Sequence, residues 1–164
     1  DMDALKAYLD ELDTDLNTVD TVVKTGNPMA DAILNSKISL ARSRNIPTQV
    51  DAHIPVKLKM SELDLCCIIG NLFDNAMEAS MALPEEKRLI RVAVYAQNGF
   101  VMLRFENYCA QEVELGADGL PRRNTHGGSD LRGVRAAAEK RGGTMTLHWE
   151  NEWFTLRVLL PQKS

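Results

Sequence analysis

The chain has 164 residues, of which 45% are hydrophobic and 26% are charged, which is the composition of a globular protein with one core or one domain and an appendage. Its formal net charge of −4 argues against a dedicated nucleic-acid-binding protein, because such proteins usually carry an excess of basic residues. The three cysteines lack CxxC spacing and support neither a disulfide framework nor a zinc site, and no apolar run reaches the roughly 18 residues of a membrane span.

The first part of the chain is predicted to form a helical hairpin. Apolar side chains recur at helical spacing over residues 3–24, and the Gly-Asn-Pro sequence at 26–28 then breaks the pattern. A second helix is expected to run to about Arg44. Its apolar stripe consists of Met29, Ile33, Leu34, Ile38 and Ala41. The exposed stripes of the hairpin need a partner, which is either the rest of the chain or a second copy.

A strand and a long helix are predicted next. Residues 48–54 alternate between apolar and polar side chains, which is the period of a strand with one buried face. The helix is expected to begin at Ser61, because Ser61 and Asp64 have the spacing of a capping box that satisfies backbone groups of the first turn. It is expected to run to about Ala82, since Pro84 cannot continue a helix.

The rest of the chain is predicted to form two hairpins with a loop and a helix between them. The expected elements are strands at 89–96 and 100–107, a long mobile loop at 109–128, a helix at 131–141, and strands at 145–149 and 154–160. Asn98-Gly99 is a strong signal for the tight turn of the first hairpin. The order of elements predicts an α+β fold, with a mixed, mostly antiparallel sheet covered by helices on one face.

The helix after Ser61 carries four polar residues at positions i, i+3, i+4 and i+7. This polar row consists of Asn71, Asp74, Asn75 and Glu78. Two interpretations fit the row: it is an ordinary polar face, exposed or closed by backbone groups, or it lines a cavity that holds a ligand with a metal ion. An asparagine oxygen suits Mg²⁺, which takes few protein ligands and completes its shell with phosphate oxygens and water.

Two further signals lie downstream. Gly127 and Gly128 precede the helix that begins at Leu131, and the free N–H groups at a helix N-terminus favour anions such as phosphates, although glycines there also serve as a plain turn. Asn107 falls on the apolar face of its strand, at the strand's end. It marks either the mouth of a pocket or a turn that ends the strand.

These three signals, in this order, resemble the GHKL superfamily of ATP-binding domains, and most closely the histidine kinases of peptide-pheromone quorum-sensing receptors. The sequence NLFDNAMEAS at residues 71–80 is similar to the N box of that family and is the most specific part of the resemblance. The resemblance covers about residues 30–161 and implies a Bergerat-type two-layer α/β sandwich that holds ATP and Mg²⁺. It also implies a helical segment at 1–45, the end of a dimerisation and phosphoacceptor region, followed by an ATP-binding catalytic domain at 46–164.

The resemblance implies roles for individual residues. Asn75 matches the asparagine that binds Mg²⁺. Asn71, the implied catalytic residue, stands where hydrolytic GHKL proteins carry a glutamate base, and because asparagine cannot act as a base, transfer to a protein histidine fits better than attack by water. The residues implied to contact the nucleotide are Asn71, Asn75, Ala79, Asn107, His126, Gly127, Gly128 and Leu131.

Two positions depart from the family pattern. Asn107 stands where most GHKL proteins carry an aspartate that reads adenine, and the glycines that accompany that aspartate are absent. Asp130 interrupts a Gly-x-Gly-Leu pattern, so that it either places a carboxylate near the phosphates or simply caps the helix. These departures motivate an alternative function, a degenerate GHKL module that binds nucleotide weakly or not at all and serves in dimerisation or other interactions.

The resemblance also implies partners for a protein histidine kinase. The γ-phosphate would go to a histidine on an upstream helix, since residues 1–44 contain no histidine and His53 and His148 lie in predicted strands. The resemblance implies that the loop at 109–128 is the ATP lid, and His126 lies in it, where it either contacts phosphate or is solvated. We therefore expect no autophosphorylation by this chain alone. In the full-length protein we expect a homodimer, a response regulator as partner, no nucleic acid, and a bacterial membrane anchor upstream of this cytoplasmic domain.

If Asp130 lies near the phosphates and repels them, Asp130→Gly should tighten MgATP binding by about threefold to tenfold, because it removes that carboxylate. Calorimetric titration of both proteins measures the change. An unchanged or weaker affinity would show that Asp130 is a helix cap.

Overall fold

The structure, a computed structural model, describes residue 4 and residues 23–55, 57–97, 99–121 and 131–162. The helix predicted over residues 3–24 lies almost entirely outside the described residues, and its predicted last positions, Val23 and Lys24, are not helical. The helical hairpin therefore stays a prediction in its first half.

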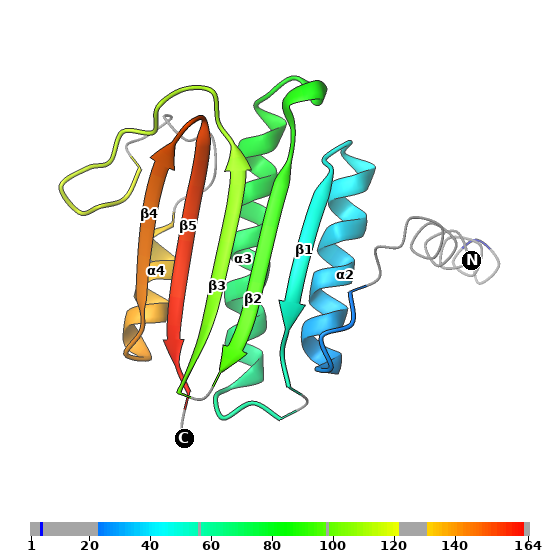
Figure 1. The fold of residues 1–164 in the computed structure, drawn as a ribbon, viewed down its shortest axis with the longest axis vertical. Coiled ribbons are helices and arrows are strands. Elements are labelled where there is room, and N and C mark those ends of the chain that lie inside the picture. The colour runs from blue at the N-terminus through cyan, green and yellow to red at the C-terminus, as the bar shows by residue number, and fades with distance from the viewer. Residues whose placement is uncertain (1–3, 5–22, 56, 98, 122–130, 163–164) are drawn as a thin grey trace.

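Five strands form one sheet in the order β1-β2-β3-β5-β4 (Figure 1). The strands are β1 (Thr48–His53), β2 (Ile90–Gln97), β3 (Phe100–Tyr108), β4 (Thr144–Glu150) and β5 (Trp153–Pro161). β1 and β2 are parallel, and all other neighbours are antiparallel. The prediction of a mixed, mostly antiparallel sheet is confirmed.

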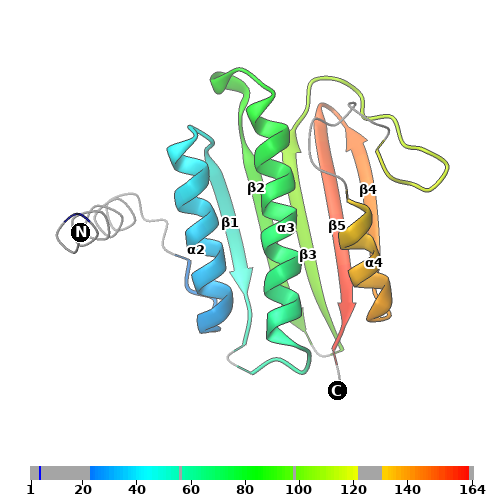
Figure 2. The ribbon, with the colours of Figure 1, turned by 180° about the vertical axis from the view of Figure 1, so that it is seen from behind.

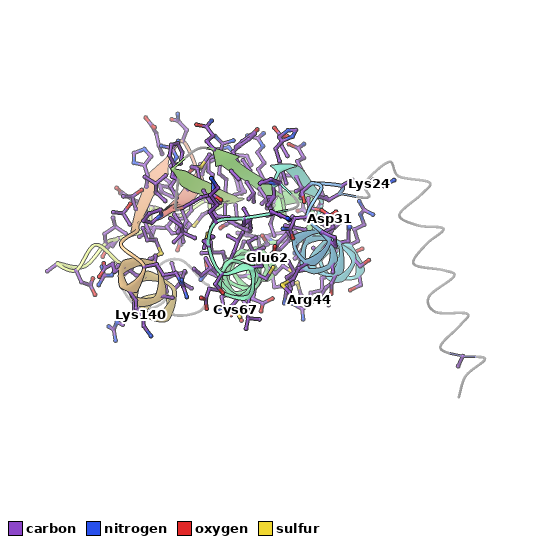
Figure 3. All side chains as sticks on the ribbon, turned by 90° about the horizontal axis from the view of Figure 1, so that it is seen from below. Lys24, Asp31, Arg44, Glu62, Cys67 and Lys140 are labelled. Atoms are coloured by element: carbon purple, nitrogen blue, oxygen red, sulfur yellow. The ribbon has the colours of Figure 1, made fainter. Side chains whose placement is uncertain are left out.

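Three helices cover one face of this sheet. They are α2 (Pro28–Ser43), α3 (Glu62–Met81) and α4 (Arg132–Lys140), and a short 3-10 helix, η1 (Glu85–Lys87), precedes β2. Figures 2 and 3 show all three on the same side, with the opposite face of the sheet left uncovered. The fold is therefore the two-layer α+β arrangement that the sequence predicts. In the part of the chain that the structure describes, no helix is both long enough and apolar enough to cross a membrane.

Helix α3 connects the two parallel strands. Parallel neighbours cannot be joined by a hairpin, and the β1-α3-β2 crossover supplies the longer connection. The register pairs Thr48 with Ile90 and His53 with Tyr95. Because α3 runs opposite to β1 and β2, and β3 is antiparallel to β2, α3 and β3 point in the same direction (Figure 1).

The core lies between the helices and the sheet, and α3 is its centre. Phe73 of α3 and Phe105 of β3 meet edge to face, with ring centroids 5.7 Å apart and an interplanar angle of 77°. The largest fully buried side chains of α3 are Leu65, Ile69, Leu72, Phe73 and Met77. Each contributes roughly 1.5–3 kcal/mol by leaving water, so this helix is the main hydrophobic element of the fold.

Helix α2 packs beside α3 with a narrower stripe than the sequence predicts. Its buried residues are Ala30, Leu34, Ile38 and Ala41. Met29 is 44% exposed, so its assignment to the buried stripe is wrong. The reason is its position one residue before Ala30, about 100° around the helix from the buried face.

The chain before α2 is tied to this helix by side-chain hydrogen bonds. The Asn35 amide accepts from the backbone N–H of Val23 (2.8 Å) and donates to its carbonyl (3.0 Å). The Asp31 carboxylate accepts from the backbone N–H and the hydroxyl of Thr25, at 2.7 and 2.6 Å. Asn27 caps α2 by accepting from the Ala30 N–H at 3.1 Å, so the entry segment and the helix start form one unit.

The start of α3 confirms the predicted cap at Ser61. The Ser61 hydroxyl accepts a hydrogen bond from the Asp64 N–H at 3.2 Å. The Asp64 carboxylate forms an ion pair with Arg141, at the end of α4. This pair joins the first turn of α3 to the last turn of α4, and the two helices therefore run antiparallel, side by side (Figure 2).

Both predicted hairpins are present. Gln97 pairs with Phe100 across the first turn, where Gly99 has φ +94°. In the second turn, between β4 and β5, Asn151 and Glu152 have φ values of 52° and 70°. Two consecutive positive φ angles are typical of the type I′ turn that matches the twist of a hairpin.

The loop after β3 is anchored over its first part, residues 109–121. Val113 and Leu120 are buried against the core. A bridge pairs Leu115 with Pro121, and the Gly116 N–H donates to the Leu120 carbonyl at 2.7 Å. The prediction of a mobile loop is therefore wrong for this part, because two apolar side chains attach it to the body.

The end of α4 depends on two glycines. Gly142 has φ +80° and donates its N–H to the Glu139 carbonyl, while the Gly143 N–H donates to the Ala138 carbonyl at 2.8 Å. This is the Schellman arrangement that satisfies the last carbonyls of a helix. A Cβ added to Gly143 would lie 2.3 Å from the Leu159 carbonyl oxygen, so β5 passes directly over this turn.

We predict that Gly143→Ala lowers the free energy of unfolding by about 1–3 kcal/mol, because the added methyl group forces backbone to move. Gly133→Ala is the matched control: a Cβ there meets nothing within 4 Å, and alanine should stabilise α4 by about 0.5–1 kcal/mol. Urea denaturation measures both. Equal effects of the two substitutions would contradict the close approach at Gly143.

Candidate functional site

The candidate site lies between α3 and α4, beyond the Phe73–Phe105 contact. Because Asp64 marks the side of α3 that faces α4, residues at i+7 and i+11 share that side. These residues are Asn71 and Asn75. Sequence-predicted site residues thus lie along the junction of the two helices.

The four residues of the predicted polar row differ in burial and in the neighbours that they face. Asn75 is buried, with 3% of its surface exposed, whereas Asn71 and Glu78 are exposed. Asp74 is turned toward α2, where Lys37 Nζ lies 2.6 Å from its Oδ1. The interpretation of the row as one inward-facing surface is therefore wrong for Asp74 and Glu78, and the role of Asn71 stays a prediction. Residues at i, i+3, i+4 and i+7 spread over an arc of about 100° on a helix, which is wide enough to meet different neighbours.

Asn75 places an amide in an otherwise apolar layer. Its helical neighbours Ala76 and Met77 are fully or almost fully buried, and Phe73 packs on the sheet. Ala79, one turn beyond Asn75, is 3% exposed. A buried amide is costly in such surroundings unless it has a partner, and Asn75 has one in this structure.

Asn107 lies where the sequence places it, on the helix-facing side of β3. The alternating buried residues of this strand end in Asn107, which is 2% exposed. Its Nδ2 donates to the Tyr108 carbonyl at 3.2 Å. Since α3 and β3 point in the same direction, Asn75 and Asn107 each follow the Phe73–Phe105 contact by two residues. Two buried amides therefore lie on the same side of this aromatic pair.

The strand end beyond Asn107 is held in place by Cys109. The Cys109 N–H donates to the Glu152 carbonyl at 2.7 Å, and the Trp149 indole N–H donates to the Cys109 carbonyl at 2.9 Å. Burial raises the pKa of the Cys109 thiol. The loop that follows β3 thus leaves from a fixed point two residues after the buried amide of Asn107.

Several predicted nucleotide contacts lie outside the described residues. These are His126, Gly127 and Gly128, together with Asp130. Leu131 is described: it precedes the first residue of α4 and is 2% exposed, so its side chain belongs to the core. The roles that the resemblance assigns to these residues stay predictions.

The amide oxygen of Asn75, on α3, is a hard donor of the kind that Mg²⁺ takes. Among the described residues, no group of three or more histidine, cysteine or acidic side chains is arranged to hold a metal ion. Zinc and calcium sites need such groups, whereas Mg²⁺ keeps several waters and takes one or two protein oxygens plus phosphates. The Asn75 amide oxygen fits that smaller requirement.

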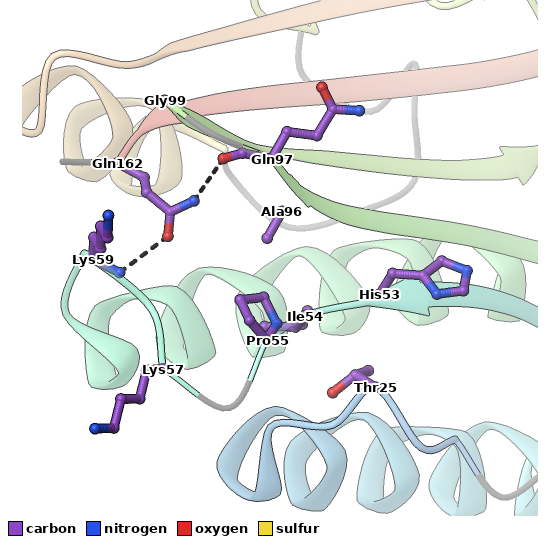
Figure 4. Close-up of a pocket in the computed structure, with 10 residues that line it drawn as sticks. All are labelled: Thr25, His53, Ile54, Pro55, Lys57, Lys59, Ala96, Gln97, Gly99 and Gln162. Carbon is purple, nitrogen blue, oxygen red and sulfur yellow. Dashed lines mark hydrogen bonds between the residues drawn. The ribbon is translucent and has the colours of Figure 1, made fainter. Parts of the chain in front are cut away.

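A separate cavity of about 1010 Å³ opens at the other end of the sheet, at the carboxyl ends of β1 and β2 (Figure 4). Gln162 spans its rim, donating to the Gln97 carbonyl at 2.7 Å and accepting from the Lys59 N–H at 3.0 Å. Figure 4 shows that Lys57 points away from the other lining residues. Polar groups do not converge on this cavity, and it lies far along the strands from Asn107.

Sequence reasoning missed Lys37 as a residue near the site. A lysine between apolar helix positions usually reaches solvent, but the Lys37 side chain is only 19% exposed. The sequence offered one signal for this contact: Lys37 follows Ile33 by four residues, so both side chains lie on the same side of α2, the side that faces α3.

Comparisons with known proteins are consistent with this geometry. The family model of the GHKL domain matches residues 60–161. A search of curated proteins found no match. Among solved structures, three nucleotide-free forms of the catalytic domain of histidine kinase ThkA are similar to this chain. The form with isopropanol has a TM-score of 0.60 and 13% identity, over 85% of this chain and 94% of that chain. The form used for MAD phasing has a TM-score of 0.62 and 14% identity over 85% and 94%, and the form with 1,2-propanediol has a TM-score of 0.61 and 14% identity over 84% and 94%. At this identity the likeness shows the fold alone.

We predict that the three cysteines react with a thiol reagent at different rates, with Cys67 first and Cys109 last. Cys67 is exposed on the outer side of α3 (Figure 3). Burial raises the pKa of Cys66 and Cys109, which leaves less of the reactive thiolate at neutral pH. Absorbance during labelling with a disulfide reagent gives the rates, and Cys67→Ser should remove the fast phase. A Cys109 that reacts as fast as Cys67 would contradict the packing described above.

Proposed function

Because the chain belongs to the GHKL domain family, we propose that it is the ATP-binding catalytic domain of a two-component sensor histidine kinase. GHKL domains bind ATP, generally with Mg²⁺, and the fold matches a histidine kinase catalytic domain. The observation that supports the proposal most directly is the buried Asn75 amide on the side of α3 that faces α4, together with a second buried amide, Asn107, near the end of β3.

Each amide has a distinct task in this proposal. The Asn75 oxygen would hold Mg²⁺, which neutralises charge on the phosphates. Asn107 would face the base. One hydrogen of its Nδ2 donates to the Tyr108 carbonyl, and in this proposal its Oδ1 would accept from an exocyclic amino group such as that of adenine.

Phosphoryl transfer to a protein histidine fits the remaining residues. Asn71 cannot act as a base, so the site lacks at this position the group that would activate water. The two described histidines are exposed side chains of the edge strands: His53 lies in β1 and His148 in β4, each paired at 3.0 Å with a carboxylate of its own strand. The acceptor would therefore be a histidine on an upstream helix, presented by the full-length protein.

The wider setting of this proposal follows from the N-box sequence at residues 71–80, which is similar to that of peptide-pheromone quorum-sensing kinases. We propose a homodimer that serves a response regulator, anchored to a bacterial membrane upstream of residue 1. The division of the chain at residues 45 and 46 is part of the same proposal.

We expect the chain to bind MgATP with a dissociation constant in the millimolar range or tighter, and Asn75→Ala to abolish detectable binding. Isothermal titration calorimetry measures both. Glu78→Gln is the matched control, because Glu78 lies on the same helix but on its exposed side, and it should change the affinity less than about twofold. An equal loss of MgATP affinity in both variants would contradict the assignment of Asn75 to the Mg²⁺ site.

The alternative is a degenerate GHKL module that serves in interactions. Asn107 favours it, since an amide replaces the charged acceptor that most of the superfamily uses to read adenine. Absence of heat on titration with MgATP, together with a far-UV spectrum of the folded state, would support this alternative over the kinase.

A further inference from the structure

Asp74 belongs to the N box but is turned away from the proposed nucleotide. Lys37 of α2 reaches it, with Nζ 2.6 Å from Oδ1, and the two side chains are 19% and 43% exposed. The pair joins the middle of α2 to the middle of α3. It does so on the flank of α3 that lies away from α4.

Gly70 explains how Lys37 reaches its partner. A Cβ at Gly70 would lie 3.6 Å from Ile33 Cδ1 and 3.7 Å from Lys37 Cε. The aliphatic stem of Lys37 therefore crosses α3 where it has no side chain. One turn further along α3, the ammonium group meets Asp74.

The ion pair contributes to how α3 is rotated about its own axis, together with the contacts of α3 to the sheet and to α4. Asp74 and Asn75 are consecutive, so their side chains leave the helix about 100° apart. When Asp74 is held against α2, Asn75 is directed inward and toward α4. A rotation of α3 that released Asp74 would carry the Asn75 amide out of that position, and displacing a positioned group by about 1 Å costs on the order of 100-fold in related cases.

The same contact compensates a charge that would otherwise disturb the site. An unpaired carboxylate one residue from the metal-binding asparagine would repel a triphosphate. Lys37 supplies the opposite charge from a side chain that is mostly buried. A second tie, from Asn27 Nδ2 to Glu62 Oε1 at 3.3 Å, holds α2 to the start of α3 and limits sliding of the two helices.

We propose that Lys37 is a positioning residue of the nucleotide site, which acts through Asp74 to orient Asn75. This inference rests on the proposed function, because the site that it serves is the MgATP site. The inference assigns a role in the site to Lys37, which lies before the part of the chain that the GHKL family model matches, residues 60–161.

Lys37→Met, which keeps the stem and removes the charge, should weaken MgATP binding about tenfold, as should Asp74→Asn. Lys37→Arg retains the ion pair and should stay within about threefold of the unmodified chain. Lys57→Met is the matched control and should have no effect, since Lys57 lies at the cavity of Figure 4. Calorimetry on the full chain gives these affinities, and normal binding by Lys37→Met would overturn the proposal.

A nucleotide-free measurement separates this inference from the proposed function. The side-chain amide signals of Asn75 in a ¹⁵N NMR spectrum should shift in Lys37→Met and Asp74→Asn but not in Lys57→Met. If the unmodified chain binds no nucleotide, the proposed function fails, and the shift alone still supports the orienting role of Lys37. Unmoved Asn75 signals would overturn that role whether or not nucleotide binds.

Discussion

The packing of α3 against three neighbours at once is the constraint on which the rest of the structure depends. It meets the sheet through Phe73 and Phe105, α2 through the ion pair of Asp74, and α4 through the ion pair of Asp64. Only one narrow side remains for solvent, and Glu78 lies there. The rotation of this helix therefore decides which polar side chain is buried, and it selects Asn75.

Much of the fold follows from periodicity and turn chemistry that the sequence displays. The cap at Ser61, the hairpin at Gly99 and the glycine end of α4 are local signals, and the structure contains each of them. Periodicity also placed Asn107 on the inner face of its strand. It failed for Met29 and for the polar row, because a helical period gives one buried direction and cannot tell how many neighbours share the remaining sides.

The candidate site was less accessible to sequence reasoning than the fold. Spacing grouped Asn71, Asp74, Asn75 and Glu78, but contacts from distant parts of the chain separate them. Lys37 lies 37 residues before its partner, and its burial depends on Gly70 leaving room for it. The assignment of Asn75 and Asn107 to a nucleotide came from the family resemblance. Physical reasoning adds that a buried amide costs about 1–3 kcal/mol when it lacks a partner, and Asn107 avoids part of that cost through its bond to the Tyr108 carbonyl.

Side-chain hydrogen bonds from α2 hold the segment that begins at Val23 against the domain. Asn35 forms hydrogen bonds with both backbone groups of Val23, and Asp31 accepts from the backbone N–H and the hydroxyl of Thr25. Each of these four bonds contributes about 1 kcal/mol, so opening them all costs a few kcal/mol. Val23 also packs against the core, so releasing residues 23–25 would break these bonds and expose part of one apolar side chain, which is a smaller change than unfolding the domain.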